Sequence, residues 1–315
     1  MIDADLLLST ARRPLVLGIG GGGDVVGALA TAEACRLYHG AEPVLGGVSW
    51  ERRPIDPQPG PRSEEEIEGA RPLGRGVLAA GPETRVRGSG VRFAESRMAE
   101  LLGEDTVLVD VTRGPAEIAD GLASAAAALG CDLVVVVDVG GDALGHGGED
   151  GLASPLCDAV MLASAARLEQ GGSVPVLGGV FGPGCDGELT PSEVLDRVAE
   201  LAAAGGLAGI RGLTFSVAER LQEAVAAVPT EASAQALRCF RGERGTTTIR
   251  GGGRTVELSP LGAVTIYFEV GAALRSAARL AAAVRHADDL ESANEMLHAL
   301  DVRTELDLER EAAAR

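Results

Sequence analysis

The sequence predicts an α/β protein with a Rossmann-like, doubly wound and mostly parallel sheet that carries helices on both faces. Short apolar stretches alternate along the chain with longer segments rich in Ala, Leu, Arg and Glu, which is typical of parallel βαβ units. A glycine run from Gly18 to Gly23 follows the first apolar stretch and satisfies the G-x-G-x-x-G dinucleotide fingerprint. With 46% hydrophobic residues, the 315-residue chain can bury a sizeable core. We therefore expect residues 1–315 to form a single α/β domain.

The expected strands share a short run of aliphatic residues and lie at Leu15–Ile19, Val44–Trp50, Thr106–Val111, Leu133–Val139 and Val174–Val180. The fourth is apolar without a break from Leu133 to Val137, as expected for a central strand that is covered on both faces. Helices are expected between the strands, at 25–38, 94–103, 116–129, 154–170 and 191–205. The last of them begins with the capping-box pattern Thr190-Pro191-Ser192-Glu193.

Three segments interrupt this alternation. Residues 51–92 are rich in Pro, Gly, Arg and Glu, which predicts a long insertion or lid with a small hairpin around 76–87. Residues 246–300 predict a C-terminal β-α layer that consists of a hairpin, a further strand and two helical stretches. Its segments are 246–250, 254–258, 264–270, 271–285 and 289–299. Residues 301–315 form a charged tail.

Composition excludes several classes of function. The net charge of −18 argues against nucleic acid as a partner, because binding to a phosphate backbone requires a basic face. All 28 basic residues are arginine, so Schiff-base chemistry and a P-loop lysine are excluded. The cysteines are odd in number and never spaced as C-x-x-C, which argues against a disulfide framework and a thiolate zinc site.

The chain also lacks the signals of a membrane or secreted protein. No apolar run approaches the ~20 residues that span a bilayer. The first residues are acidic, whereas a signal peptide begins with basic ones. We expect a cytoplasmic protein without a membrane partner, and homo-oligomerisation stays open.

The glycine run predicts an anion site. Gly20, Gly21, Gly22 and Gly23 lie between an expected strand and an expected helix, where free N–H groups and the positive end of the helix dipole converge. These glycines are therefore our candidates for binding a phosphate. Asp24 does not fit this interpretation, because its carboxylate follows the last glycine, where the phosphate would lie.

A second group of polar residues follows the fourth expected strand. Asp138 ends a strand that should be buried, and Gly140 and Gly141 let the chain turn closely around a ligand before Asp142. A divalent metal held by Asp24, Asp138 and Asp142 would explain a carboxylate in an anion loop, and carboxylate ligands favour Mg²⁺ or Mn²⁺. Structural roles stay open: Asp138 can accept N–H groups of its own loop, and Asp24 can cap its helix.

Two further residues are candidates for chemistry at this edge. His146 lies between glycines in a loop expected to face the pocket, so we expect it, with Asp142, to act in acid–base catalysis. Arg113 follows the third expected strand and can bind a phosphate with two hydrogen bonds. A core or surface role for His146 and salt bridging by Arg113 are the structural alternatives.

Several motifs resemble those of a known family. They are the segments 18–28 (GIGGGGDVVGA), 138–144 (DVGGDAL), 154–159 (SPLCDA) and 259–269 (SPLGAVTIYFE). Together they are similar to a family found mainly in archaea and some actinobacteria, catalogued as domain of unknown function 1152. The resemblance covers nearly the whole chain and implies one full-length domain with a Rossmann-like core. It implies no activity.

The residues favour an enzyme that acts on a small phosphorylated or nucleotide-like substrate, as a metal-assisted hydrolase or group transferase. The alternative is an NAD(P)-dependent oxidoreductase, for which the glycine fingerprint is the argument. Its ribose-binding acid is expected ~20 residues after the loop, whereas the nearest candidate, Glu51, comes several residues later. A second alternative is a non-catalytic ligand-binding or sensor protein.

Overall fold

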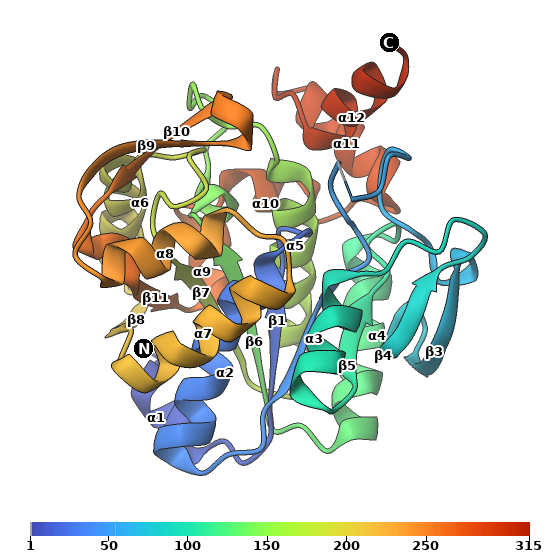
Figure 1. Cartoon of the computed structure of the whole chain (residues 1–315), viewed down its shortest axis with the longest axis horizontal. Coiled ribbons are helices and arrows are strands. Elements are labelled where there is room, and N and C mark those ends of the chain that lie inside the picture. Colours follow the sequence, from blue (N-terminus) through green and yellow to red (C-terminus); the bar gives the residue numbers. More distant parts are fainter. Residues whose placement is uncertain (1, 54) are drawn as a thin grey trace.

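A computed structural model describes residues 2–53 and 55–315 of the chain. Within these residues the strands form a nine-stranded main sheet and a separate two-stranded one (Figure 1). The order of the main sheet is β3-β4-β5-β2-β1-β6-β7-β11-β8. Its strands are β1 (Pro14–Gly18), β2 (Val44–Val48), β3 (Ile67–Gly74), β4 (Val77–Val86), β5 (Thr106–Val109), β6 (Leu133–Val139), β7 (Val176–Phe181), β8 (Leu207–Gly212) and β11 (Val264–Phe268). The small sheet pairs β9 (Gly245–Ile249) with β10 (Arg254–Leu258).

The helices cover both faces of the main sheet, so the expected doubly wound α/β fold is confirmed. One face is packed by α1 (Ala4–Thr10), α2 (Asp24–His39), α3 (Ala94–Leu102), α7 (Phe215–Ala227) and α8 (Ala232–Phe240). The other is packed by α4 (Pro115–Leu129), α5 (Pro155–Gly171), α6 (Pro191–Ala203), α9 (Val270–Arg275), α10 (Arg279–Val284) and α11 (Leu290–His298). None of the helices in the described ranges combines the length and apolar composition needed to cross a bilayer.

Side chains of the central strands alternate between two hydrophobic cores. On β1, Leu15 and Leu17 enter one core while Val16 enters the other. On β6, Val134 and Val136 likewise face away from Val135, and all are fully buried. This continuous burial explains why the central strands are apolar at every position, in contrast to strands with one solvated face.

The parallel strands place a ligand site at the middle of the sheet. In sheet order they are β5, β2, β1, β6 and β7, all of which run parallel. The chain builds outward from β1 through β2 to β5, and then returns to the opposite side of β1 with β6. Strand order therefore reverses between β1 and β6, and the crevice beyond their carboxyl ends is where open α/β sheets bind ligands.

The segment 51–92 differs from its expected form. It contains β3 and β4, and β4 pairs antiparallel with β5, so much of the expected insertion is one edge of the main sheet. The expected hairpin around 76–87 is in fact formed by β4 and the preceding strand β3. Polar residues such as Arg71 concealed β3 in the sequence, because an edge strand need not be apolar.

The C-terminal part also differs. The β9–β10 hairpin is confirmed, but β11 lies inside the main sheet between β7 and β8 instead of in an added layer. Residues of the expected charged tail form α12 (Glu305–Ala313), in which Glu305 and Glu309 are buried. Strand β8 and helices α1, α7 and α8 were not expected from the sequence.

Candidate functional site

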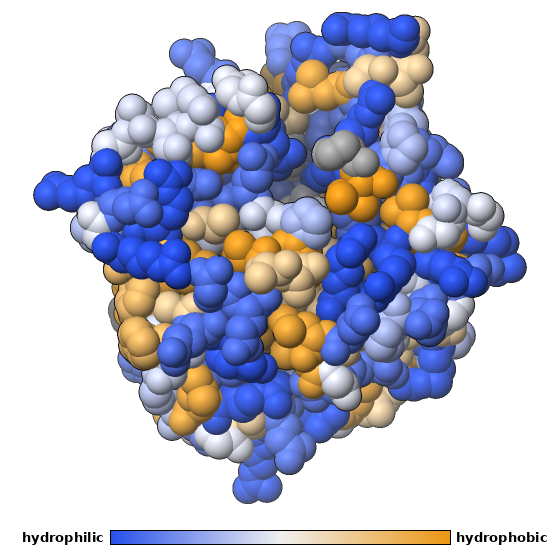
Figure 2. Space-filling view, viewed as in Figure 1, coloured by the Kyte–Doolittle hydropathy of each residue, from blue (hydrophilic) through white to orange (hydrophobic). Residues whose placement is uncertain are grey.

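A cavity of about 610 Å³ opens where strand order reverses. In the space-filling view the surface is hollowed below the β9–β10 hairpin and beside the C-terminal helices (Figure 2). The floor comes from the loops after β1, β6 and β7 and from the first turn of α5, and the rim comes from the loop after β2, the α7–α8 loop and the hairpin. Its polar lining residues are Asp24, Glu51, Arg52, Arg53, Asp142, Ser154, Asp158, Asp186, Glu188, Thr230, Glu231, Arg250 and Arg254.

The glycine loop after β1 lies against the cavity as expected. Gly21 and Gly22 adopt φ of 78° and 58°, the left-handed region that favours glycine. A Cβ on Gly20 would lie 2.6 Å from Asp24 Oδ2 and 3.0 Å from Asp158 Oδ2. Gly20 therefore gives two carboxylates room to approach the loop.

The first acidic cluster consists of Asp24, Asp138 and Asp158, which offer carboxylate oxygens within 4.8 Å of one another. Asp24 Oδ2 accepts hydrogen bonds from the N–H groups of Gly20 and Val139, at 2.9 and 3.3 Å. Asp138 and Asp158 are each 1% exposed. One oxygen of each, Asp138 Oδ1 and Asp158 Oδ1, is buried without a hydrogen-bond partner among the residues that the structure describes.

The electrostatics of this first cluster are unfavourable for three negative charges. Burial, together with repulsion from Asp138, raises the pKa of Asp24 to about 8. Burial also raises the pKa of Asp138 to about 7. The pKa of Asp158 lies well above its ordinary value because of burial and the nearby Asp138 and Asp24. Such a group of carboxylates requires either protons or a cation.

The second acidic cluster consists of Asp142, Asp186 and Glu188, whose carboxylate oxygens also lie within 4.8 Å of one another. It adjoins the first cluster, because burial and the nearby charges of Asp158, Glu188 and Asp138 raise the pKa of Asp142. In this second cluster Glu188 is the residue with many partners. Its Oε2 accepts the N–H groups of Ala153 and Ser154 at 2.7 and 2.8 Å, and its Oε1 pairs with the Ser154 hydroxyl.

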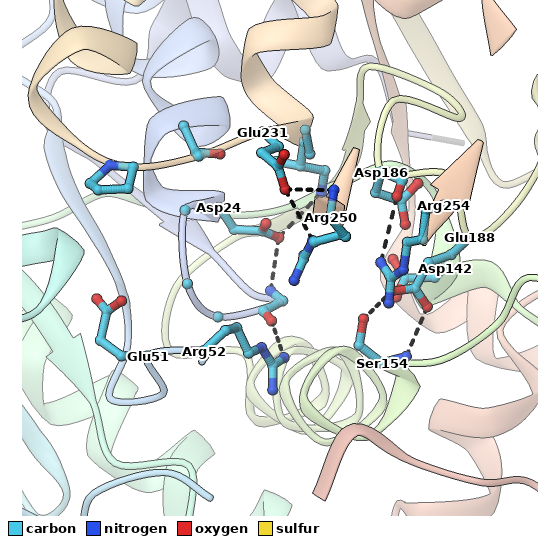
Figure 3. Close-up of a pocket in the computed structure, with 18 of the residues that line it drawn as sticks. Asp24, Glu51, Arg52, Asp142, Ser154, Asp186, Glu188, Glu231, Arg250 and Arg254 are labelled. Atoms are coloured by element: carbon cyan, nitrogen blue, oxygen red, sulfur yellow. Dashed lines mark hydrogen bonds and ion pairs between the residues drawn. The ribbon is translucent and has the colours of Figure 1, made fainter. Parts of the chain in front are cut away.

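Arginines lie among these acids in the cavity (Figure 3). Arg254 of β10 forms an ion pair with Glu188 at 2.6 Å. Arg250 lies at the turn of the hairpin, 3.7 Å from Glu231, with an unusual φ of 54°. Arg52 stacks on Trp50 with its guanidinium carbon 4.4 Å from the ring centre and donates to the carbonyl oxygen of Gly20 at 2.5 Å. A ligand in the cavity therefore meets both carboxylates and guanidinium groups.

The structure brings most of the predicted site residues together. Gly20, Gly21, Gly22, Gly23, Asp24 and Asp142 line the cavity. Asp138 lies behind the lining in the first cluster, so the expected metal ligands Asp24, Asp138 and Asp142 are divided between two adjoining clusters. Gly140 and Gly141, with φ of 128° and 122°, shape the loop behind the second cluster.

Two predicted residues lie elsewhere, and their expected positions require correction. The ring of His146 is held by Arg197 and Glu200 of α6, at 2.7 and 3.3 Å, and is not among the described residues that line the cavity. Burial and Arg197 lower its pKa.

Arg113 also lies apart from the described lining of the cavity, because acids of three segments surround it. It pairs with Asp110, Glu64 and Glu117 at 3.3, 2.6 and 2.9 Å. These ion pairs occupy its guanidinium group, so Arg113 forms salt bridges, which was the alternative to phosphate binding.

Sequence reasoning assigned no role to Asp158, Asp186, Glu188, Arg250 and Arg254. Asp186 and Glu188 follow β7 at the same edge of the sheet, and Asp158 lies in the first turn of the helix after β6, so position relative to the strands was an available signal. For Arg250 and Arg254 the sequence carries no comparable signal, because only the folded position of the hairpin brings them over the cavity.

Comparison with known proteins bears out the resemblance seen in the motifs. Neither the curated proteins nor the solved structures include a match to this chain. A family model described as "Protein of unknown function (DUF1152)" matches residues 15–313, which is nearly the whole chain. The chain therefore belongs to this family.

Proposed function

We propose that the protein is an enzyme that uses a divalent cation, Mg²⁺ or Mn²⁺, to hydrolyse or transfer a group of a small phosphorylated or nucleotide-like substrate. The observation that carries this proposal is the first acidic cluster, Asp24, Asp138 and Asp158, at the point where strand order reverses. Buried oxygens of Asp138 and Asp158 lack hydrogen-bond partners within the described parts of the chain. A cation would satisfy them.

The ligand chemistry of the first cluster supports a hard cation. Its members offer only carboxylate oxygens, which suit Mg²⁺ and Mn²⁺ better than zinc. The guanidinium of Arg52, which lies close enough to affect Asp24 and Asp158, already donates to the Gly20 carbonyl and pairs with Glu305 at 3.3 Å. A cation bound here would polarise an oxygen of the substrate or lower the pKa of a bound water.

The surroundings of this cluster support an anionic substrate. The cavity is bounded by the glycine loop at the N-terminus of α2, where the helix dipole favours negative charge. Arg53, Arg250 and Arg254 line the same cavity and offer planar donors that match phosphate oxygens. A phosphate group would fit between the cation and these arginines.

Asp142 is the residue for proton transfer in this proposal. It lines the cavity and is 5% exposed. Burial and the neighbouring acids Asp158 and Glu188 raise its pKa well above the ordinary value. A buried carboxyl group whose pKa is raised can donate a proton as a general acid. This is the role that His146 cannot serve from its position beside α6.

Two features weigh against the NAD(P) alternative. The carboxylate of Asp24 already accepts the Gly20 N–H in the loop, where a pyrophosphate would otherwise bind. The Glu51 carboxylate, the candidate for the ribose hydroxyl, is buried and accepts the Ala94 N–H. A non-catalytic sensor would bind the same ligands without turning them over, so an activity measurement separates it from an enzyme.

The test is Mn²⁺ binding by the whole chain, followed by thermal unfolding and by titration calorimetry. A free Mn²⁺ concentration of one hundred times Kd would stabilise the wild-type protein by ~2.7 kcal/mol, which raises Tm by several degrees. Asp158→Asn should lose the stabilisation that an ion at the first acidic cluster provides, whereas Asp196→Asn, an exposed change on α6, should retain the full gain.

The second arm adds nucleotides or sugar phosphates in the presence of Mn²⁺ and follows release of phosphate or loss of substrate. Stabilisation that needs both the metal and the phosphorylated compound, with turnover, supports the proposal. Stabilisation by NAD(P)H without metal, or equal Mn²⁺ binding by Asp158→Asn and the wild type, would show that it is wrong. Binding without turnover would favour the sensor.

A further inference from the structure

The second acidic cluster, Asp142, Asp186 and Glu188, has features of a cation site of its own. Its members are 5%, 6% and 3% exposed, and each offers a carboxylate oxygen within 4.8 Å of the others. Asp186 Oδ1 is buried and has no hydrogen-bond partner in residues 2–53 and 55–315. Asp142 and Asp186 both line the cavity, so their carboxylates are reached from the same space as the first cluster.

The backbone is arranged to seat these carboxylates. Gly140, directly after β6, has φ of 128°, and a Cβ at this position would lie 2.2 Å from Cγ of Asp186. Any side chain here would therefore displace Asp186. On the other side, the N–H groups of Ala153 and Ser154 hold Glu188 Oε2, and the Ser154 hydroxyl pairs with Oε1, so this carboxylate is fixed in place.

One positive charge already lies in this second cluster. Arg254 pairs with Glu188 Oε1 at 2.6 Å and reaches the carbonyl oxygen of Asp186 at 3.5 Å (Figure 3). It does not satisfy Asp186 Oδ1, which stays without a partner in the described structure. A single guanidinium thus balances part of the charge of three buried carboxylates and occupies one ligand oxygen.

We propose that Asp142, Asp186 and Glu188 bind a second divalent cation beside the one at Asp24, Asp138 and Asp158, in competition with Arg254. This inference rests on the proposed function and extends it to a two-ion centre, in which Asp142 is a ligand of the second ion in place of the general acid. Two ions ~3.5–4 Å apart stabilise both the attacking and the leaving oxygen in displacement at phosphorus. Arg254, released from Glu188, would then bind the phosphate. The substrate class that this arrangement fits is a phosphate ester or anhydride.

The experiment counts Mn²⁺ ions. Metal-free protein is titrated with Mn²⁺, the free ion is followed by its electron paramagnetic resonance signal, and the bound ions are examined for magnetic coupling. We expect the wild type to bind two ions per chain with a coupled spectrum. Asp186→Asn and Asp158→Asn should each bind one ion without coupling, and Asp196→Asn should behave as the wild type.

Arg254→Gln provides a second measurement that does not remove a ligand. Loss of the competing guanidinium should lower the Kd of the more weakly bound Mn²⁺ ion by about tenfold, because a positive charge a few ångströms away opposes cation binding. Circular dichroism melting confirms that each variant is folded.

Different failures have different meanings. One ion per wild-type chain, bound equally by Asp186→Asn, would show that the second site is wrong while the proposed function stands. If Asp186→Asn still binds two ions, the second ion lies elsewhere. If folded Asp186→Asn binds neither ion, both ions depend on Asp186 and the two clusters are not separate sites. Both overturn the inference. A wild type that binds no Mn²⁺ would overturn the proposed function as well.

Discussion

Among single residues, Glu51 is a buried acid whose ionisation can be followed apart from the acidic clusters. It follows β2, is 8% exposed, and accepts the Ala94 N–H at 2.5 Å. Burial raises its pKa from an ordinary 4.5 to about 7, against the smaller opposing effect of that hydrogen bond. The folded protein therefore keeps a proton on Glu51 at pH values where the unfolded chain has released it.

This shift predicts how stability depends on pH. Between about pH 4.5 and about pH 7 the folded state binds one proton more than the unfolded state at Glu51, so the free energy of unfolding falls as pH rises through this window. Glu51→Gln keeps a hydrogen-bond acceptor and cannot ionise, so it should remove this part of the fall. We expect the variant to be nearly as stable as the wild type at pH 5 and more stable at pH 8, by at most roughly 3 kcal/mol.

Urea unfolding at pH 5, 6, 7 and 8 measures the effect of Glu51→Gln. Glu42→Gln serves as the control, because Glu42 is an exposed acid, 82% exposed at its side chain. It should leave the pH profile unchanged. Parallel profiles for Glu51→Gln and the wild type would show that Glu51 is ionised in the folded protein.

Between elements, Arg113 links three segments and lies apart from the described lining of the cavity. It joins Asp110 at the end of β5, Glu64 of the short 3₁₀ helix η1 (Glu64–Glu66) and Glu117 of α4. Asp110 is 1% exposed, so removal of the guanidinium would leave a buried carboxylate without its cation. Arg113→Met should lower the free energy of unfolding by about 3 kcal/mol.

Arg75 offers a matched control for this prediction. It also pairs with Glu117, at 3.3 Å, but its side chain is 70% exposed. Arg75→Met should change stability by less than ~1 kcal/mol, as is usual for exposed pairs. Chemical unfolding gives both values, and calorimetry with Mn²⁺ and phosphate should show wild-type binding in each variant. Weaker phosphate binding by folded Arg113→Met would restore the sequence-based role of this arginine.

The elements that the sequence predicted are those in which the residue types of a short segment already indicate whether its side chains are buried or exposed. Strands β1 and β6 are apolar along their whole length because both faces are buried, and a run such as Leu133–Val137 has few other interpretations. Strand β8 contains Gly209 and Gly212 and is partly exposed at the sheet edge, so neither composition nor alternation distinguished it. Its position depends on β11, which comes more than fifty residues later in the chain.

The same distinction applies to the candidate site. Asp24 was found because it follows a glycine loop at the start of a helix, and Asp138 because it lies at a strand end before a glycine loop, which are local patterns. His146 and Arg113 have similar local surroundings, but partners in α6, α4 and η1 occupy their side chains. Pairing across the fold decides which charged side chains stay free for a ligand, and no local spacing encodes it.

Across the whole molecule, the last helix contributes to the site although it lies outside the expected fold. Glu305 of α12 accepts the N–H groups of Leu156 and Cys157 at the start of α5, at 3.0 and 2.9 Å. Glu309 accepts from Gly60 at 2.8 Å and from the Trp50 indole at 3.1 Å. Helix α12 thus joins the segment before β3 to the loop after β2 and the N-terminus of α5 (Figure 1), and the last two hold residues of the cavity.

Glu305→Gln tests whether α12 both stabilises the protein and adjusts the charge of the cavity. The carboxylate at this position is 4% exposed, caps α5 and pairs with Arg52 at 3.3 Å. The neutral glutamine should lower the free energy of unfolding by roughly 2 kcal/mol, because the N–H groups of α5 then bond to an uncharged acceptor, which is weaker than a carboxylate. It should also make Arg52 more available to an anion, so inorganic phosphate should bind a few-fold more tightly.

The matched control for Glu305→Gln is Glu311→Gln on the same helix. Glu311 is half exposed at its side chain and pairs only with Arg303 among the described residues, so both the stability and the phosphate affinity should match the wild type. Urea unfolding and calorimetric titration with phosphate give the two readouts. Lower stability without tighter binding would mean that Arg52 stays held by Glu309, 3.7 Å away, and that α12 acts on the fold alone. Equal stability of the two variants would show that the cap on α5 does not depend on the charge of Glu305.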